Sequence, residues 1–208
     1  MSASRCAALR YLEQARDRDH LYEITELALR RVPIVCIPGF TMEQNHALRR
    51  MNQSVLHTAQ LENQHREVLI VNNLRFDGSP ITILGSLNRV NYADHIEIDV
   101  LKSNSYAGEL IFAHNHPSTR AFSLVDLAMF LVDEYIGVFS VVTNLGQVYV
   151  LYKLEHFDYH KARGALELVI DQFALKRYPS DEERQERAAR MLLRKLQKGG
   201  VWYGKSNG

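Results

Sequence analysis

A short apolar strand that runs into two histidines limits the folds open to this 208-residue chain. Residues 109–114, ELIFAH, contain the apolar run Leu110–Ala113, which is typical of a strand buried on both faces. His114 ends that run, and His116 follows one residue later. Residues i and i+2 of a strand point to the same face, so both imidazoles can reach one ion. The chain therefore needs a sheet that buries this strand and holds two imidazoles at its end.

A carboxylate follows at the right place to complete a set of metal ligands. Asp126 lies in the first turn of an amphipathic helix expected over residues 123–134. Together with His114 and His116 it would leave the fourth position of a tetrahedral zinc ion open for water, as in catalytic sites. Ser123 and Asp126 also match a capping box, so Asp126 has a purely structural reading as well. The two roles do not exclude each other.

Ser123 has the same two readings. As the N-cap it would accept a hydrogen bond from the helix backbone. As a donor it could stabilise the oxyanion that forms when hydroxide attacks a carbonyl, an effect typically worth about 3–4 kcal/mol.

Hydrolysis of an amide at a zinc site usually needs a further carboxylate that is not a ligand and that transfers a proton. The candidates are Glu67, Glu97 and Glu109. Glu109 lies on the histidine strand at an odd offset from His114, which puts it on the opposite face and about 17 Å away at roughly 3.3 Å per residue. Glu97 falls in a segment of ambiguous structure. Glu67 begins the first expected strand, where it could also be a solvent-facing residue.

The central part of the chain predicts the order strand, strand, helix, strand, helix, strand, strand. The strands are expected at residues 67–74, 80–87, 109–114, 137–144 and 147–153, and the helices at 91–104 and 123–134. Asp77-Gly78 is a hairpin signal between the first two strands. The segment 91–104 also contains an alternation that fits a strand, and we favour a helix.

Helical segments flank this central part. Residues 5–63 are expected to be helical with a break near Pro33, and Thr41 with Gln44 predicts a capping box. Residues 155–177 predict another helix. Ser180 and Glu183 cap a last helix that runs to about Lys198, and the tail 199–208 is expected to be loose. The domain division expected from these patterns is a helical extension at 1–63, a central domain at 64–154 and a helical extension at 155–208.

The composition sets wider limits. A net charge of +1 argues against a dominant polyanion-binding surface. Only Cys6 and Cys36 are present, so a disulfide framework is not expected and a reducing, cytoplasmic setting is the default. No apolar run approaches the roughly 18–20 residues of a membrane span.

The segment His114-Asn-His116-Pro117, followed by Ser123 and Asp126, resembles the JAMM motif, also called JAB or MPN-plus, of zinc metalloproteases. That motif reads Glu, then His-x-His-Pro, then Ser-x-x-Asp. The local sequence FAHNHPS, residues 112–118, is most similar to the RadC-type and prokaryotic JAB branch of this family. The resemblance covers about residues 64–153.

The resemblance implies an α/β fold like that of cytidine deaminase, with a mixed sheet between helices. It implies that zinc is bound by His114, His116 and Asp126, that Ser123 is the oxyanion donor, and that Glu67 is the general acid and base. Family enzymes typically cut peptide or isopeptide bonds after the C-termini of ubiquitin or ubiquitin-like proteins, which makes a protein tail the expected substrate. The chain departs from the family in the loop between Pro117 and Ser123, whose five residues are one fewer than usual.

Two other functions remain open. Residues 176–205 hold nine Lys and Arg against four acids, so a RadC-like protein linked to DNA or mobile elements is one alternative. Such a helix is more often a solvated face or a partner-binding element. The other alternative is an effector or toxin domain that docks a partner through its helical ends.

Overall fold

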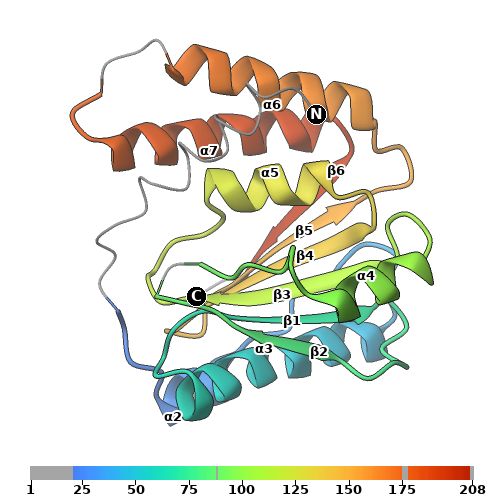
Figure 1. Cartoon of the computed structure of the whole chain (residues 1–208), viewed down its shortest axis with the longest axis vertical. Coiled ribbons are helices and arrows are strands. Elements are labelled where there is room, and N and C mark those ends of the chain that lie inside the picture. The colour runs from blue at the N-terminus through green and yellow to red at the C-terminus, as the bar shows by residue number, and fades with distance from the viewer. Residues whose placement is uncertain (1–20, 88, 175–177, 207–208) are drawn as a thin grey trace. The chain divides into compact units, whose positions relative to one another are not determined.

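A computed structural model describes residues 21–87, 89–174 and 178–206 of the chain. The described part has a mixed α/β fold with a six-stranded mixed sheet and six helices (Figure 1). The helices are α2 (Glu26–Arg31), α3 (Met42–Glu62), α4 (Ile96–Ser103), α5 (Leu124–Val132), α6 (Tyr159–Ala174) and α7 (Asp181–Lys198). The helical stretch expected over residues 5–20 lies outside the described residues.

The sheet has the strand order β2-β1-β3-β4-β5-β6. The strands are β1 (Val68–Asn73), β2 (Ile81–Leu84), β3 (Leu110–His116), β4 (Ile136–Thr143), β5 (Val148–Lys153) and β6 (Val201–Lys205). The neighbours β3 and β4 are parallel, whereas the pairs β1–β2, β1–β3 and β4–β5 are antiparallel. The order β1, β2, α4, β3, α5, β4, β5 confirms the succession of elements expected for the central part, including the helix at the ambiguous segment.

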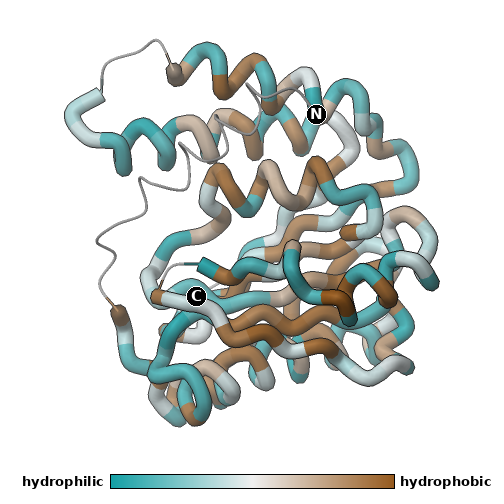
Figure 2. Tube along the Cα trace, in the orientation of Figure 1, coloured by the Kyte–Doolittle hydropathy of each residue, from teal (hydrophilic) through white to brown (hydrophobic). Residues whose placement is uncertain are grey.

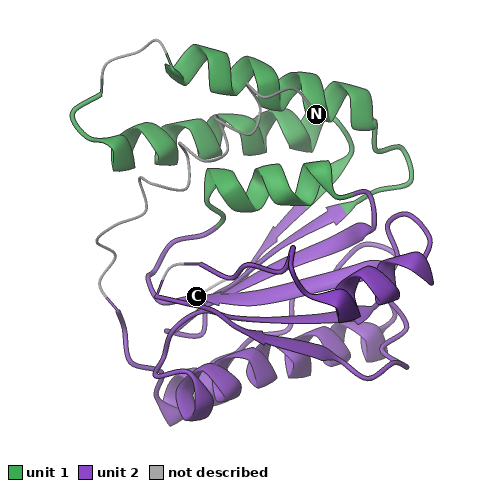
Figure 3. Cartoon of the chain, in the orientation of Figure 1, with its two compact units in different colours: residues 1–18, 122–133, 153–202 green, residues 19–121, 134–152, 203–208 purple. Residues whose placement is uncertain are grey.

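The chain divides into two compact units (Figure 3). One unit contains α5, α6 and α7, and each of these three helices packs against the other two. The other unit contains α2, α3, α4 and most of the sheet. The division into three domains that the sequence suggests stays a prediction.

The two central strands form the core of the sheet-containing unit. Every residue of β3 and of β4 is buried, and both strands are strongly apolar (Figure 2). Helix α3 packs against β1, β3 and β4. Ser140 of β4 donates a hydrogen bond of 2.9 Å to the side-chain oxygen of Asn52 in α3, so Ser140 and its β3 neighbour Ala113 mark the face that α3 covers.

A close backbone approach fixes how β3 and β4 begin. A Cβ atom on Gly137 of β4 would lie 1.9 Å from the carbonyl oxygen of Gly108, so no side chain fits there. Gly108 itself has a φ of +75°, a region that favours glycine. The β3–β4 register shifts between Leu110 and Ile111, directly after this contact.

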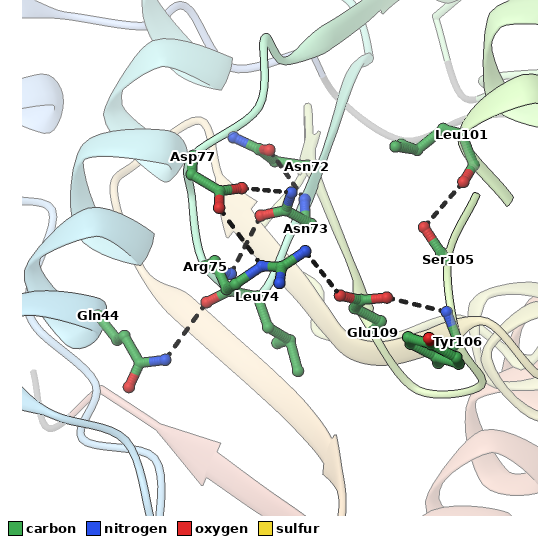
Figure 4. A network of polar contacts seen from close by, with 10 residues as sticks. All are labelled: Gln44, Asn72, Asn73, Leu74, Arg75, Asp77, Leu101, Ser105, Tyr106 and Glu109. Atoms are coloured by element: carbon green, nitrogen blue, oxygen red, sulfur yellow. Dashed lines mark hydrogen bonds and ion pairs between the residues drawn. The ribbon is translucent and has the colours of Figure 1, made fainter.

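A polar network joins the β1–β2 turn to the start of β3 (Figure 4). The guanidinium group of Arg75 lies 3.4 Å from a carboxylate oxygen of Asp77 and 3.2 Å from one of Glu109. The other carboxylate oxygen of Glu109 accepts a 2.8 Å hydrogen bond from the backbone N–H of Tyr106. Glu109 is therefore engaged in holding this end of the sheet together.

The tail expected to be loose is instead partly ordered, and that expectation is wrong for residues 201–205. These residues form β6, which extends the sheet next to β5. The backbone N–H of Ser206 donates a 2.9 Å hydrogen bond to the carbonyl of Val148. The expectation rested on the usual looseness of chain ends, but an edge strand supplies backbone partners that no local pattern reveals.

Two helix starts follow the sequence closely. Thr41 and Gln44 form a complete capping box at the start of α3. Ser180 accepts a 3.1 Å hydrogen bond from the backbone N–H of Glu183 and caps α7, which ends at Lys198 as expected.

The α3 cap gives a test of this account. We expect Thr41→Ala to lower the free energy of unfolding by about 0.5–2 kcal/mol, because it removes the hydroxyl that satisfies a backbone N–H. The control is Ser54→Ala, at an exposed position in the middle of the same helix, where alanine is a better helix former than serine. Urea denaturation measures both, and an equal loss in the two variants would contradict the capping role.

Candidate metal centre

The two histidines lie at the C-terminal end of β3. Their side chains are on the face of the sheet opposite to Ala113, which is on the face that α3 covers. The ring of His114 lies 5.2 Å from that of Phe139 in β4, measured between centroids. The Nε2 atoms of His114 and His116 are 2.9 Å apart, so the two rings converge on one point. Both residues are buried. The i, i+2 spacing on a strand has therefore placed two imidazoles on one face, as the sequence predicts.

A backbone carbonyl sets the tautomer of His116. Its Nδ1 atom lies 3.1 Å from the carbonyl oxygen of Arg120. A carbonyl oxygen only accepts hydrogen bonds, so Nδ1 carries the proton and Nε2 keeps its lone pair. Metal-binding histidines usually have such a partner on the other ring nitrogen. The short loop after Pro117 thus prepares the Nε2 atom of His116 to act as a ligand.

Ser123 and Asp126 stand at the start of α5 and form the capping box that the sequence predicts. The Ser123 hydroxyl accepts a 3.1 Å hydrogen bond from the backbone N–H of Asp126. The Oδ2 atom of Asp126 accepts a 2.6 Å hydrogen bond from the backbone N–H of Ser123. Asp126 is buried, which is unusual for an aspartate in a first helical turn.

His114, His116 and Asp126 form one group of candidate ligands. The ligand atoms of these three buried residues all lie within 4.8 Å of one another. Two nitrogen ligands of a tetrahedral zinc ion at about 2.0–2.1 Å would be about 3.3 Å apart, close to the 2.9 Å between the two Nε2 atoms. The donor set and its spacing could therefore hold a metal ion.

Glu67 lies just before β1 and is buried. In the β1–β3 register Leu69 is opposite His114, and continuing this register by two residues sets Glu67 opposite His116. Directly opposite residues of an antiparallel pair share a face of the sheet. Glu67 therefore shares its face with the two histidines.

The other two candidate carboxylates lie elsewhere. Glu109 precedes the opposite end of β3 and pairs with Arg75. Glu97 is an exposed residue in the first turn of α4. Of the three carboxylates, only Glu67 is brought by strand register to the histidine end of the sheet.

Two buried asparagines next to the site had no role in the sequence analysis. The side chain of Asn115, between the histidines, donates a 2.8 Å hydrogen bond to the side-chain oxygen of Asn144, which follows β4. Both residues are completely buried. The available signal was an asparagine inside an otherwise apolar strand, since buried amides require partners.

A zinc-dependent stability measurement separates the two roles of Asp126. We expect zinc to raise the melting temperature of the wild-type protein, because a ligand that binds only the folded state stabilises it. Asp126→Asn should lose most of that increase. Ser123→Ala is the matched control: it removes the cap hydroxyl, lowers stability by about 1 kcal/mol with or without zinc, and keeps the zinc effect. An equal zinc effect in Asp126→Asn and wild type would make Asp126 a cap alone.

Among the described helices, none is both long enough and apolar enough to cross a membrane. No protein family, no curated protein and no solved structure matches the chain.

Proposed function

We propose that this protein is a zinc-dependent metallopeptidase or isopeptidase of the JAMM type. The observation that carries the proposal is the convergence of two buried imidazole nitrogens, 2.9 Å apart, with the buried carboxylate of Asp126. The proposal also draws on the sequence motif His114-Asn-His116-Pro117 with Ser123 and Asp126. On this proposal the sheet and its helices form the cytidine-deaminase-like sandwich that the motif implies.

His114, His116 and Asp126 would hold the ion with three protein ligands. A catalytic zinc ion with three protein ligands lowers the pKa of a water molecule towards neutrality and polarises a carbonyl group. Burial of the three ligands keeps competing water away and strengthens their electrostatic attraction for a cation. The Arg120 carbonyl holds the His116 ring in the orientation and tautomer that this task requires.

Glu67 would serve as the general acid and base. Its place opposite His116 puts a carboxylate on the histidine face that is not one of the three grouped ligands. From there it takes a proton from the attacking water and delivers it to the leaving amine. Ser123 would donate its hydroxyl hydrogen to the oxyanion, the role that the motif implies for it.

The substrate class follows from the motif. We propose a protein tail, with the C-terminus of a ubiquitin-like protein as the first candidate, and a cytoplasmic setting for the reaction. The short loop 118–122 directly follows the histidines, so it is a candidate segment for selecting the tail.

The DNA-linked alternative loses support from the charges on α7. Three of its arginines form ion pairs within the helix, Arg184 with Asp181, Arg187 with Glu183 and Arg190 with Glu186. Such pairs reduce the positive charge that the helix offers to phosphates. Lys176 and Arg177 lie outside the described residues.

Metal content tests the proposal most directly. We expect about one zinc ion per chain in the purified protein by elemental analysis, and its loss in His116→Ala, which removes one of three ligands. The control is His57→Ala, an exposed histidine on α3. A folded wild-type protein without zinc, also after incubation with zinc and dialysis, would refute the proposal.

Glu67→Gln tests the assignment of the acid and base. We expect it to lower hydrolysis of a ubiquitin-like protein with a fluorogenic C-terminal amide by at least about 100-fold while zinc stays bound, because general acid–base catalysis typically contributes about 10²–10⁴-fold. Glu109→Gln and Glu97→Gln make the same change at the other two carboxylates and should retain activity. Full activity in Glu67→Gln would assign the proton transfer to another group.

A further inference from the structure

Asn115 is buried and its side chain bonds to the backbone on both sides of Glu67, although the proposed function assigns no role to Asn115. It lies between His114 and His116 on β3, so its side chain points to the opposite face of the sheet. Its amide oxygen accepts a 2.7 Å hydrogen bond from the backbone N–H of Val68. Its amide nitrogen donates a 3.1 Å hydrogen bond to the carbonyl of Arg66. These two partners are the residues on either side of Glu67.

The side chain of Asn115 takes the place of a backbone group in the sheet. A carboxamide offers the same kinds of donor and acceptor as a peptide bond, so it can bond to the backbone N–H and C=O groups of a neighbouring segment. The β1–β3 register ends at the pair Leu69 and His114. Beyond that pair, the Asn115 amide continues the ladder and brackets Glu67 on both sides.

Asn144 anchors this bracket to the strand on the other side of β3. Its side-chain oxygen accepts a 2.8 Å hydrogen bond from the amide of Asn115, and its side-chain nitrogen donates to the carbonyl of His65 at 2.9 Å. The backbone N–H of Asn144 donates to the carbonyl of His116 at 2.9 Å. Residues 65–68 are thus tied to the end of the histidine strand by two buried amides.

We infer that Asn115 is a positioning residue that holds the Glu67 carboxylate in place opposite His116, with Asn144 as its anchor. This inference rests on the proposed function, since it assigns Asn115 its task through the acid and base of that reaction. The bracket is made of buried groups, and a buried amide without its partner is costly, so the arrangement resists distortion.

The test compares Asn115→Ala with Asn45→Ala. Asn45 is also buried, and its amide oxygen also accepts a backbone hydrogen bond, from Ile37 at 3.0 Å, but it lies in α3 outside the bracket. We expect Asn115→Ala to retain zinc and to lower kcat by about 10- to 100-fold, with KM within about twofold, because small displacements of catalytic groups have effects of this size. Asn45→Ala should leave both constants unchanged.

A double-mutant cycle shows whether Asn115 acts through Glu67. In the Glu67→Gln background, Asn115→Ala should cause no further loss of kcat, because the group that it positions is already gone. A full additional loss in that background would overturn the inference. If Asn115→Ala fails to fold, Asn115→Asp keeps the amide-like oxygen, removes the N–H donors and is measured instead.

Two further measurements need neither zinc nor a substrate. In the metal-free protein, the Val68 amide should exchange its hydrogen at least about tenfold faster in Asn115→Ala than in wild type or Asn45→Ala, because its acceptor is lost. The effects of Asn115→Ala and Glu67→Gln on the unfolding equilibrium constant should also deviate from additivity by at least about threefold, whereas Asn45→Ala and Glu67→Gln should add.

These measurements separate the two ideas. A wild-type protein without zinc or hydrolysis would remove the proposed function, while faster Val68 exchange and a coupled stability cycle would still support the bracket. Unchanged Val68 exchange together with additive effects would overturn the inference even in an active zinc enzyme.

Discussion

Because β3 is buried along all seven of its residues, the polar side chains at its end depend on partners inside the protein rather than on water. The strand ends in His-Asn-His, so three polar side chains enter a region where water cannot satisfy them. The histidines meet each other on one face, and Asn115 meets the backbone of residues 66 and 68 on the other. The candidate metal centre and the asparagine bracket thus lie on opposite faces of one strand, and both arise because polar side chains are buried at its end.

The capping box at the start of α5 differs from the other caps because Asp126 is buried. The caps of α3 and α7 use the exposed side chains of Thr41 and Ser180. An exposed cap loses little hydration free energy, because water still solvates the part of the side chain that does not bond to the backbone. The carboxylate of Asp126 makes its cap hydrogen bond while buried, and burial of a charge is costly unless it is compensated. An exposed cap would have served the helix as well, and the burial of Asp126 is consistent with the metal-ligand role proposed for it.

The sequence allowed most of the fold to be predicted because its signals are local. Apolar runs, turn dipeptides and caps such as Thr41 act over a few residues, and the elements that they indicate in the central part, from β1 to β5, are present. Strand β6 was missed because an edge strand depends on its neighbour rather than on its own residues. The convergence of His114 and His116 follows from their spacing, and the place of Glu67 required the β1–β3 register, which no single segment contains. Asn115 escaped notice because its partners are backbone groups nearly fifty residues away in the chain.

The approach of Gly137 to Gly108 reaches beyond the end of the sheet where it occurs. Any side chain at position 137 would push the parallel strands β3 and β4 apart, and β3 carries both histidines at its far end. Among natural variants that keep this fold, position 137 should therefore stay glycine whether or not the histidine pair is kept. Variation at position 137 would mark chains in which β3 and β4 no longer begin in this close contact.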